Sequence, residues 1–177
     1  MSFTKINCFD LEMCCWKDKS ETGKKTGEII EIGLCKIDLE KGSIIKRAQY
    51  YVKPEVDEIS PFCTNLTGIT PAKISKQGRP LKDVLKSIEN KFGGNNSTFL
   101  AWGLDDQVLF QECINKGLKQ PFKNYINLAL IDRVLNRRKS KISMTEVMKE
   151  NNIDFLGNLH SGYDDAYNLG RLALKIL

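Results

Sequence analysis

Three segments near the start of the chain alternate apolar and polar residues with the two-residue period of β-strands. They cover residues 6–13, 28–38 and 43–52, and the second is rich in β-branched residues. Side chains on a strand point alternately to the two faces of a sheet, so each segment is expected to bury one face. Lys41-Gly42 is a turn signal between the last two segments. The opening of the chain therefore predicts a three-stranded antiparallel meander.

The remainder of the chain is dominated by helical periodicity. Residues 81–92 carry an apolar stripe that is closed by Gly93, and Thr70 followed by Pro71 is a typical helix start. Further helices are expected at residues 105–116, 143–150 and 164–177. A polar connection is expected at residues 17–25, a buried strand at 97–102 and a strand or extended segment at 124–130. This order predicts an α/β fold with a mixed β-sheet flanked by helices.

Length and composition limit the class of protein. A chain of 177 residues, 41% of them hydrophobic, is expected to form a single domain over residues 1–177. It contains no run of 18 apolar residues and no charged-then-apolar leader, which predicts neither a membrane span nor a secretory signal. Without heptads or repeats, a monomer is the default expectation. The net charge of +5 favours anionic partners.

The six cysteines indicate the compartment. They show no C-x-x-C spacing, and the chain has a single histidine, so a zinc finger is not expected. We interpret most of the cysteines as small buried hydrophobic residues in a reducing environment, which predicts a cytoplasmic protein.

Two acidic residues stand on the same face of the first predicted strand. Asp10 and Glu12 fall on one side, and Phe9, Leu11 and Met13 fall on the other. Neighbouring carboxylates at the end of an apolar strand repel each other and lose hydration, a cost that a bound cation removes. The alternative interpretation is a hairpin end whose acids face water.

The last predicted helix carries another acid toward the core. Helical steps from Asp165 lead to residues 169, 172 and 176, which are apolar and must pack on the sheet. The same steps from Asp164 lead to Asn168, Arg171 and Lys175, which predicts a solvent face. His160 lies five residues before Asp165 in a glycine-flanked loop. It is either a general base or an incidental histidine.

Several strings, taken in order along nearly the whole chain, carry a family resemblance. They are F-D-L-E, E-I-I-E-I-G, Y-V-K-P, S-P-F-C-x-x-L-T-G-I-T, A-W-G and H-x-x-x-D-D-A-x-N. Together they resemble the DEDDh 3′–5′ exonucleases, and most closely the Eri-type and KapD-like branch. The resemblance implies an RNase H-like fold. It also implies cleavage of RNA or single-stranded DNA from the 3′ end to nucleoside 5′-monophosphates.

The resemblance further implies a set of site residues. Asp10, Glu12, Asp165 and an acid after the buried strand would hold two Mg²⁺ or Mn²⁺ ions, with His160 as general base. Helical spacing permits either Asp105 or Asp106 as that acid, and we choose Asp105. Glu12 is also expected to take part in catalysis by meeting the terminal sugar hydroxyl.

Three apolar side chains near this set are candidates for contact with the substrate. Phe62 is a candidate for stacking on a terminal base, and Leu11 and Met13 flank Glu12, although core packing is the alternative for both. Two other functions fit the same residues: a catalytically silent nucleic-acid-binding scaffold, and a phosphoesterase restricted to very short oligonucleotides.

Overall fold

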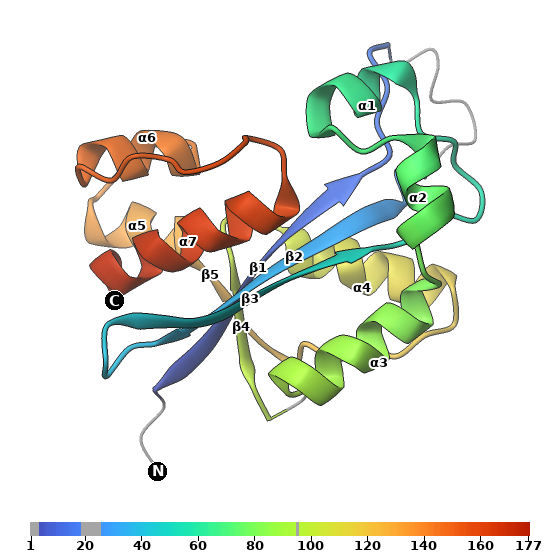
Figure 1. Ribbon diagram of the computed structural model, residues 1–177. Helices are drawn as coiled ribbons and strands as arrows, with labels where there is room; N and C mark the ends of the chain where they lie inside the picture. The colour runs from blue at the N-terminus through green and yellow to red at the C-terminus, as the bar shows by residue number, and fades with distance from the viewer. Residues whose placement is uncertain (1–3, 19–25, 95) are drawn as a thin grey trace.

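The computed structural model describes residues 4–18, 26–94 and 96–177 (Figure 1). Most of the connection expected at 17–25 lies outside these residues. The described strands are β1 (Lys5–Met13), β2 (Ile29–Asp38), β3 (Ser43–Tyr51), β4 (Thr98–Ala101) and β5 (Asn124–Asn127). The described helices are α1 (Pro61–Thr67), α2 (Pro71–Gln77), α3 (Leu81–Phe92), α4 (Asp105–Asn115), α5 (Leu128–Leu135), α6 (Met144–Glu150) and α7 (Gly162–Ile176).

The strands form one mixed sheet in the order β3-β2-β1-β4-β5. Strands β1, β2 and β3 pair antiparallel, which confirms the predicted meander. Strand β4 pairs parallel to β1, and β5 pairs parallel to β4. Because β1 and β4 are parallel neighbours, their carboxyl ends meet at the same edge of the sheet. The topology therefore brings the end of β1 close to the start of α4.

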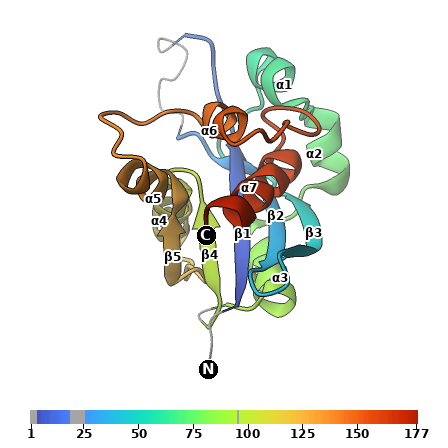
Figure 2. The same cartoon turned by 90° about the vertical axis from the view of Figure 1, so that its left-hand side faces the viewer.

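Helices cover both faces of this sheet, which confirms the predicted class. On one face Phe9 and Leu11 of β1 pack with the apolar stripe of α3 and with Leu109 of α4. On the other face Cys8 of β1 packs with α6 and with Leu169 of α7. Figures 1 and 2 show α3 and α7 on opposite sides of the sheet. The alternation predicted for the first strand thus separates two hydrophobic layers.

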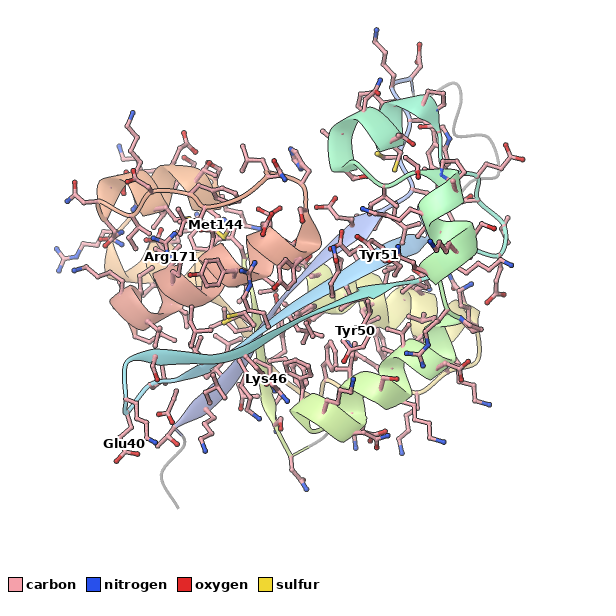
Figure 3. All side chains as sticks on the ribbon, viewed as in Figure 1. Glu40, Lys46, Tyr50, Tyr51, Met144 and Arg171 are labelled. Atoms are coloured by element: carbon pink, nitrogen blue, oxygen red, sulfur yellow. The ribbon has the colours of Figure 1, made fainter. Side chains whose placement is uncertain are left out.

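A smaller apolar cluster lies beyond the carboxyl end of β1. Consecutive residues Tyr50 and Tyr51 of β3 belong to different clusters, Tyr50 to the one around α3 and Tyr51 to the one beneath α1 and α2 (Figure 3).

Helix α1 was not predicted from the sequence. Its start is capped by Ser60, whose Oγ accepts a hydrogen bond from the Cys63 N–H at 3.0 Å. Gly68 ends it with a φ of 70°.

The segment 124–130 is only partly extended. It forms β5 for its first four residues, and Asn127 then caps helix α5 by accepting a hydrogen bond from the Leu130 N–H at 3.2 Å. The expectation of a strand or extended segment is therefore wrong for its second half. A side-chain cap decides the change of structure at a position where the apolar run suits either a strand or a helix.

Two compositional expectations have a structural counterpart. The six cysteines are all free, and five of them are buried. In the part of the chain that the structure describes, none of the helices combines the length and the apolar character needed to cross a membrane.

Candidate active site

Asp10 and Glu12 lie in the carboxyl-terminal half of the central strand β1. Their antiparallel partners on β2 are Gly33 for Asp10 and Glu31 for Glu12. Directly paired residues project to the same face of a sheet, and this is the face that α7 covers. The structure confirms that the two acids share a face and that Phe9 and Leu11 enter the opposite core. The two carboxylates therefore lie between the sheet and the start of α7.

Gly33 permits α7 to approach the sheet closely. A Cβ atom built on Gly33 would lie 1.8 Å from the carbonyl oxygen of Gly162, the first residue of α7. A side chain at Gly33 would separate the helix from the strand, because the opposing atoms belong to backbone that cannot rotate away. Two glycines that are distant in the sequence thus set how near α7 lies to Asp10.

The close approach brings three carboxylates together. One carboxylate oxygen from each of Asp10, Glu12 and Asp165 lies within 4.8 Å of the other two. Asp165 and Glu12 are buried, and Asp10 is partly exposed. The inward orientation predicted for Asp165 is confirmed: it belongs to the buried face of α7 together with Leu169 and Leu172.

These acids carry unfavourable charge in the absence of a cation. Burial raises the pKa of Asp10 well above its usual value, and repulsion by Asp105, Asp165 and Glu12 raises it further. Burial and the carboxylates of Asp165 and Glu31 raise the pKa of Glu12 to about 8. Burial also raises the pKa of Asp165 to about 7, against the opposing effect of hydrogen bonds from two backbone amides. The charged groups that most raise the pKa values of Asp10 and Glu12 are other carboxylates, and a divalent cation would stabilise such an environment.

The two candidate acids after β4 have different surroundings. The Asp105 carboxylate accepts hydrogen bonds from the backbone N–H of Leu11 and from its own, and burial is the main cause that raises its pKa to about 6. Among the charged neighbours of Asp10, Asp105 contributes most to raising the pKa of Asp10. The Asp106 side chain instead interacts with the hydroxyl of Tyr125. Asp105 lies outside the group that meets within 4.8 Å, but it faces that group, and Asp106 faces β5.

This difference predicts unequal effects of substitution at the two positions. We expect Asp105→Asn to lower kcat by about 10² or more, because it removes a charge beside Asp10, Glu12 and Asp165. Asp106→Asn preserves the shape of a side chain that faces Tyr125, and it should leave kcat within about threefold of the wild type. Single-turnover nuclease rates of the two purified variants provide the measurement. Equal losses would contradict the assignment of Asp105.

His160 precedes α7 in a tightly bonded loop. Its side chain is exposed, and its backbone adopts a φ of 60°, an uncommon conformation for a residue other than glycine. The Asp165 carboxylate accepts hydrogen bonds from the backbone N–H groups of His160 and Ser161. The backbone of His160 is therefore linked to the carboxylate of Asp165.

The prediction that residues 168, 171 and 175 of α7 form a solvent face is wrong for the first two. Lys175 is exposed as expected, but Asn168 is fully buried and Arg171 is partly buried. Asn168 accepts a hydrogen bond from the Leu156 N–H at 3.1 Å and donates one to the Leu156 carbonyl at 2.8 Å. Arg171, seen in Figure 3, donates to the Asn168 amide oxygen at 2.9 Å. The loop before α7 folds back over this face, which the local sequence pattern does not reveal.

Asp164 also contacts the loop that precedes α7. It accepts a hydrogen bond from the Asn158 N–H at 3.0 Å and forms an ion pair with Arg47 at 3.0 Å. The Arg47 guanidinium lies 3.8 Å from the centre of the Tyr163 ring and 4.0 Å from that of Tyr167. Strand β3 therefore fixes the first turn of α7 through a charged and aromatic contact.

A cavity of about 680 Å³ opens beside Glu12, the member of the acidic group that lines it. Leu11 and Met13 line it, and Leu11 also belongs to the core, which was the alternative to substrate contact. Phe62 does not appear among its described lining residues and lies 37% exposed on α1. Leu66 and Leu104 do line the cavity and were not predicted. The sequence feature that could have identified Leu104 as a lining residue is its position directly before Asp105.

Comparison with known proteins agrees with this geometry. The exonuclease family RNase_T matches residues 8–173. The chain is 27% identical to the 3′-5′ exonuclease Snipper of Drosophila melanogaster, over 99% of this chain and 70% of that protein. It is 30% identical to ERI1 exoribonuclease 2 of Danio rerio, over 99% of this chain and 35% of that protein. The chain therefore spans about a third of the length of this second relative.

Solved structures show the same fold. A 3′-exonuclease described in 3′-end specific recognition of a histone mRNA stem-loop superposes with a TM-score of 0.87 at 26% identity, over 99% of this chain and 82% of that one. The nuclease domain of 3′hExo, a DEDDh family member bound to rAMP, gives a TM-score of 0.84 at 26% identity, over 98% and 91% of the two chains. These matches confirm the RNase H-like fold. The chain is thus a member of the RNase_T exonucleases and, within them, of the DEDDh 3′–5′ exonuclease family.

Proposed function

We propose that this protein is a divalent-metal-dependent exonuclease that removes nucleoside 5′-monophosphates from the 3′ end of RNA. The observation that carries the proposal is the convergence of Asp10, Glu12 and Asp165 within 4.8 Å, with the carboxylates of Asp105 and Glu31 as further charged neighbours. RNA is favoured as the substrate because relatives are named exoribonucleases and a similar nuclease domain binds rAMP. Single-stranded DNA is the second polymer to be tested.

The donor set fits Mg²⁺ or Mn²⁺. Asp10, Glu12, Asp165 and Asp105 offer only hard carboxylate oxygens, which these ions prefer, and four carboxylates balance the charge of two divalent ions. When bound, such a pair of ions activates a water molecule and stabilises the charge that develops on the phosphodiester oxygens. The contribution of the chain is to hold the acids at fixed positions on β1, α4 and α7.

His160 and the cavity complete the proposal. We assign His160 the role of general base, because its exposed ring can exchange protons with solvent and its backbone is bonded to Asp165. The terminal nucleoside would occupy the cavity beside Glu12, between Met13, Leu66 and Leu104. In that place Glu12 can accept a hydrogen bond from a sugar hydroxyl.

The test is digestion of 5′-labelled RNA and DNA, single- and double-stranded, with Mg²⁺, Mn²⁺ or EDTA. We expect stepwise shortening of RNA from the 3′ end, release of nucleoside 5′-monophosphates, and no digestion in EDTA. Persistent cleavage in EDTA would overturn the metal requirement. Binding without cleavage would instead support a silent scaffold, and cleavage restricted to the shortest oligonucleotides would support a narrower phosphoesterase.

The raised pKa values predict how metal binding depends on pH. An acid whose pKa is higher in the folded protein keeps protons that the unfolded chain releases, so the metal-free protein loses stability as the pH rises from about 4 to about 8. The pKa values of Asp105, Asp165 and Glu12, about 6, 7 and 8, set the upper part of this window. Cations must displace these protons. The rise in Tm caused by Mg²⁺ should therefore be small near about pH 5.5 and large near about pH 8.5.

Thermal unfolding with saturating Mg²⁺ or with EDTA measures this difference. Asp10→Asn is the control, because a variant that lacks an acid of the cluster should show little response to Mg²⁺ at either pH. An equal Tm rise at both pH values in the wild type would contradict the prediction.

A further inference from the structure

A fifth carboxylate, that of Glu31, lies next to the four acids and makes different contacts. Glu31 is 1% exposed and pairs with Glu12 across the β1–β2 ladder, so both side chains reach the face covered by α7. Among the described residues, the group whose oxygens meet within 4.8 Å consists of Asp10, Glu12 and Asp165, and Glu31 does not belong to it. Glu31 therefore lies close to the three acids without being a fourth member of their group, and its function must be sought in its other contacts.

The Glu31 carboxylate is occupied by the start of α7. Its Oε1 accepts a hydrogen bond from the Tyr163 N–H at 2.9 Å, and the carboxylate also accepts one from the Gly162 N–H. These amides belong to the first turn of the helix, where backbone donors have no partner within the helix. The usual capping residue, Ser161, makes no side-chain hydrogen bond to the helix. Glu31, which lies on strand β2, thus caps the N-terminus of helix α7.

Other contacts hold Glu31 in this position. Gln49 on β3 donates a hydrogen bond from Nε2 to Glu31 Oε1 at 2.8 Å. The close contact between Gly33 and Gly162 brings the helix start within reach of the carboxylate. A negative charge at a helix N-terminus is also favoured by the helix dipole. The cap is therefore rigid and has a defined distance from β1.

The helix turn that Glu31 holds carries two groups of the proposed catalytic centre. Asp165 lies in this turn, and its carboxylate accepts the backbone N–H of His160. A shift of the first turn would move both groups relative to Asp10 and Glu12, which belong to β1. Displacements of about 1 Å in a catalytic geometry can lower a rate by about 10².

We infer that Glu31 is a positioning residue that sets the register of Asp165 and His160 against Asp10 and Glu12 by capping α7 from strand β2. The inference rests on the proposed function and deepens it. It assigns to Glu31 the role of a hydrogen-bond acceptor, and its charge is secondary. An uncharged side chain of the same shape with an oxygen in the same place should therefore perform most of the role.

The test compares Glu31→Ala, Glu31→Gln and Asp38→Ala. Asp38 is a matched control because it is also buried on β2 and also accepts two backbone amides, those of Glu40 and Lys41, but at the far end of the strand. We expect Glu31→Ala to lower kcat per folded molecule by about 10- to 100-fold with a smaller change in KM. Glu31→Gln should recover most of the rate, and Asp38→Ala should keep the wild-type kcat while lowering Tm.

Hydrogen exchange separates this inference from the proposed function. The Gly162 and Tyr163 amides should exchange faster in Glu31→Ala than in the wild type, and Glu31→Gln should restore their protection. A wild-type protein without nuclease activity would refute the proposed function, and the exchange data would still decide the capping contact. A kcat unchanged in Glu31→Ala, an equal loss in Asp38→Ala, or a Gln variant as impaired as the Ala variant would overturn the positioning role.

A second variant covers the case in which Glu31→Ala does not fold. Gln49 is exposed and its replacement by Ala removes one hydrogen bond to the Glu31 carboxylate. We expect Gln49→Ala to fold and to lower kcat by about three- to tenfold, the range that corresponds to the loss of one hydrogen bond. An unchanged kcat in this variant would count against the inference.

Discussion

Asp10→Asn is expected to abolish nuclease activity and to stabilise the metal-free protein at the same time. The activity should fall by at least about 10³-fold, because loss of a single transition-state donor already costs about 10²–10³ and Asp10 serves at the centre of the acidic group. Its partners Glu12 and Asp165 lie within 4.8 Å. The asparagine has nearly the same shape, so the fold should be unaffected.

The gain in stability has an electrostatic origin. Burial and the neighbouring acids raise the pKa of Asp10 well above its usual value, which means that its ionised form is unfavourable in the folded protein. An amide removes that cost. In EDTA at about pH 8 the variant should have a higher Tm than the wild type, and in Mg²⁺ the order should reverse because only the wild type binds the ions well.

Nuclease rates and thermal unfolding of the same two preparations provide the measurement. Asp106→Asn is a suitable control, because its side chain faces Tyr125. A variant that loses activity and also loses stability in EDTA would show that Asp10 has a structural role. That result would contradict the interpretation of the acidic group as a strained cation site.

Gly33→Ala is expected to have the largest effect on stability. The added methyl group would lie 1.8 Å from the Gly162 carbonyl oxygen and 2.5 Å from the Tyr163 nitrogen. Overpacking typically costs about 1–3 kcal/mol, and the opposing atoms here are backbone, so we expect about 3 kcal/mol or more. Helix α7 must move away from β2 to relieve the contact. Asp165 would move with it, and activity should fall by at least about 10²-fold.

Gly170→Ala on the same helix provides the comparison. A methyl group there would meet the Cys35 sulfur at 2.8 Å and the Ile37 Cγ2 at 3.1 Å. These are side-chain atoms that can adjust, and alanine favours the helix by about 1 kcal/mol over glycine. We expect a smaller loss of stability and a nearly normal kcat. Urea unfolding and initial rates measure both effects, and equal destabilisation by the two variants would contradict the argument from backbone contact.

Local patterns predicted much of the fold, for reasons visible in particular segments. The alternation in β1 separates Phe9 and Leu11 from Asp10 and Glu12, because strand side chains change face at each residue. Helix α3 has the predicted bounds of residues 81–92. Helices α1 and α5 were missed, since both are short and begin at side-chain caps within segments that suit more than one structure.

The sequence by itself determined most of the helices and strands, the central strand with its two acids and the inward face that carries Asp165. Only the tertiary structure separated the surroundings of Asp105 and Asp106, because both lie in the same helical turn and differ in what meets them from β1 and β5. The approach of Gly33 to Gly162 and the capping of α7 by Glu31 also required the folded chain. These contacts join residues about 130 positions apart, and no local periodicity encodes a contact between segments so distant in the sequence.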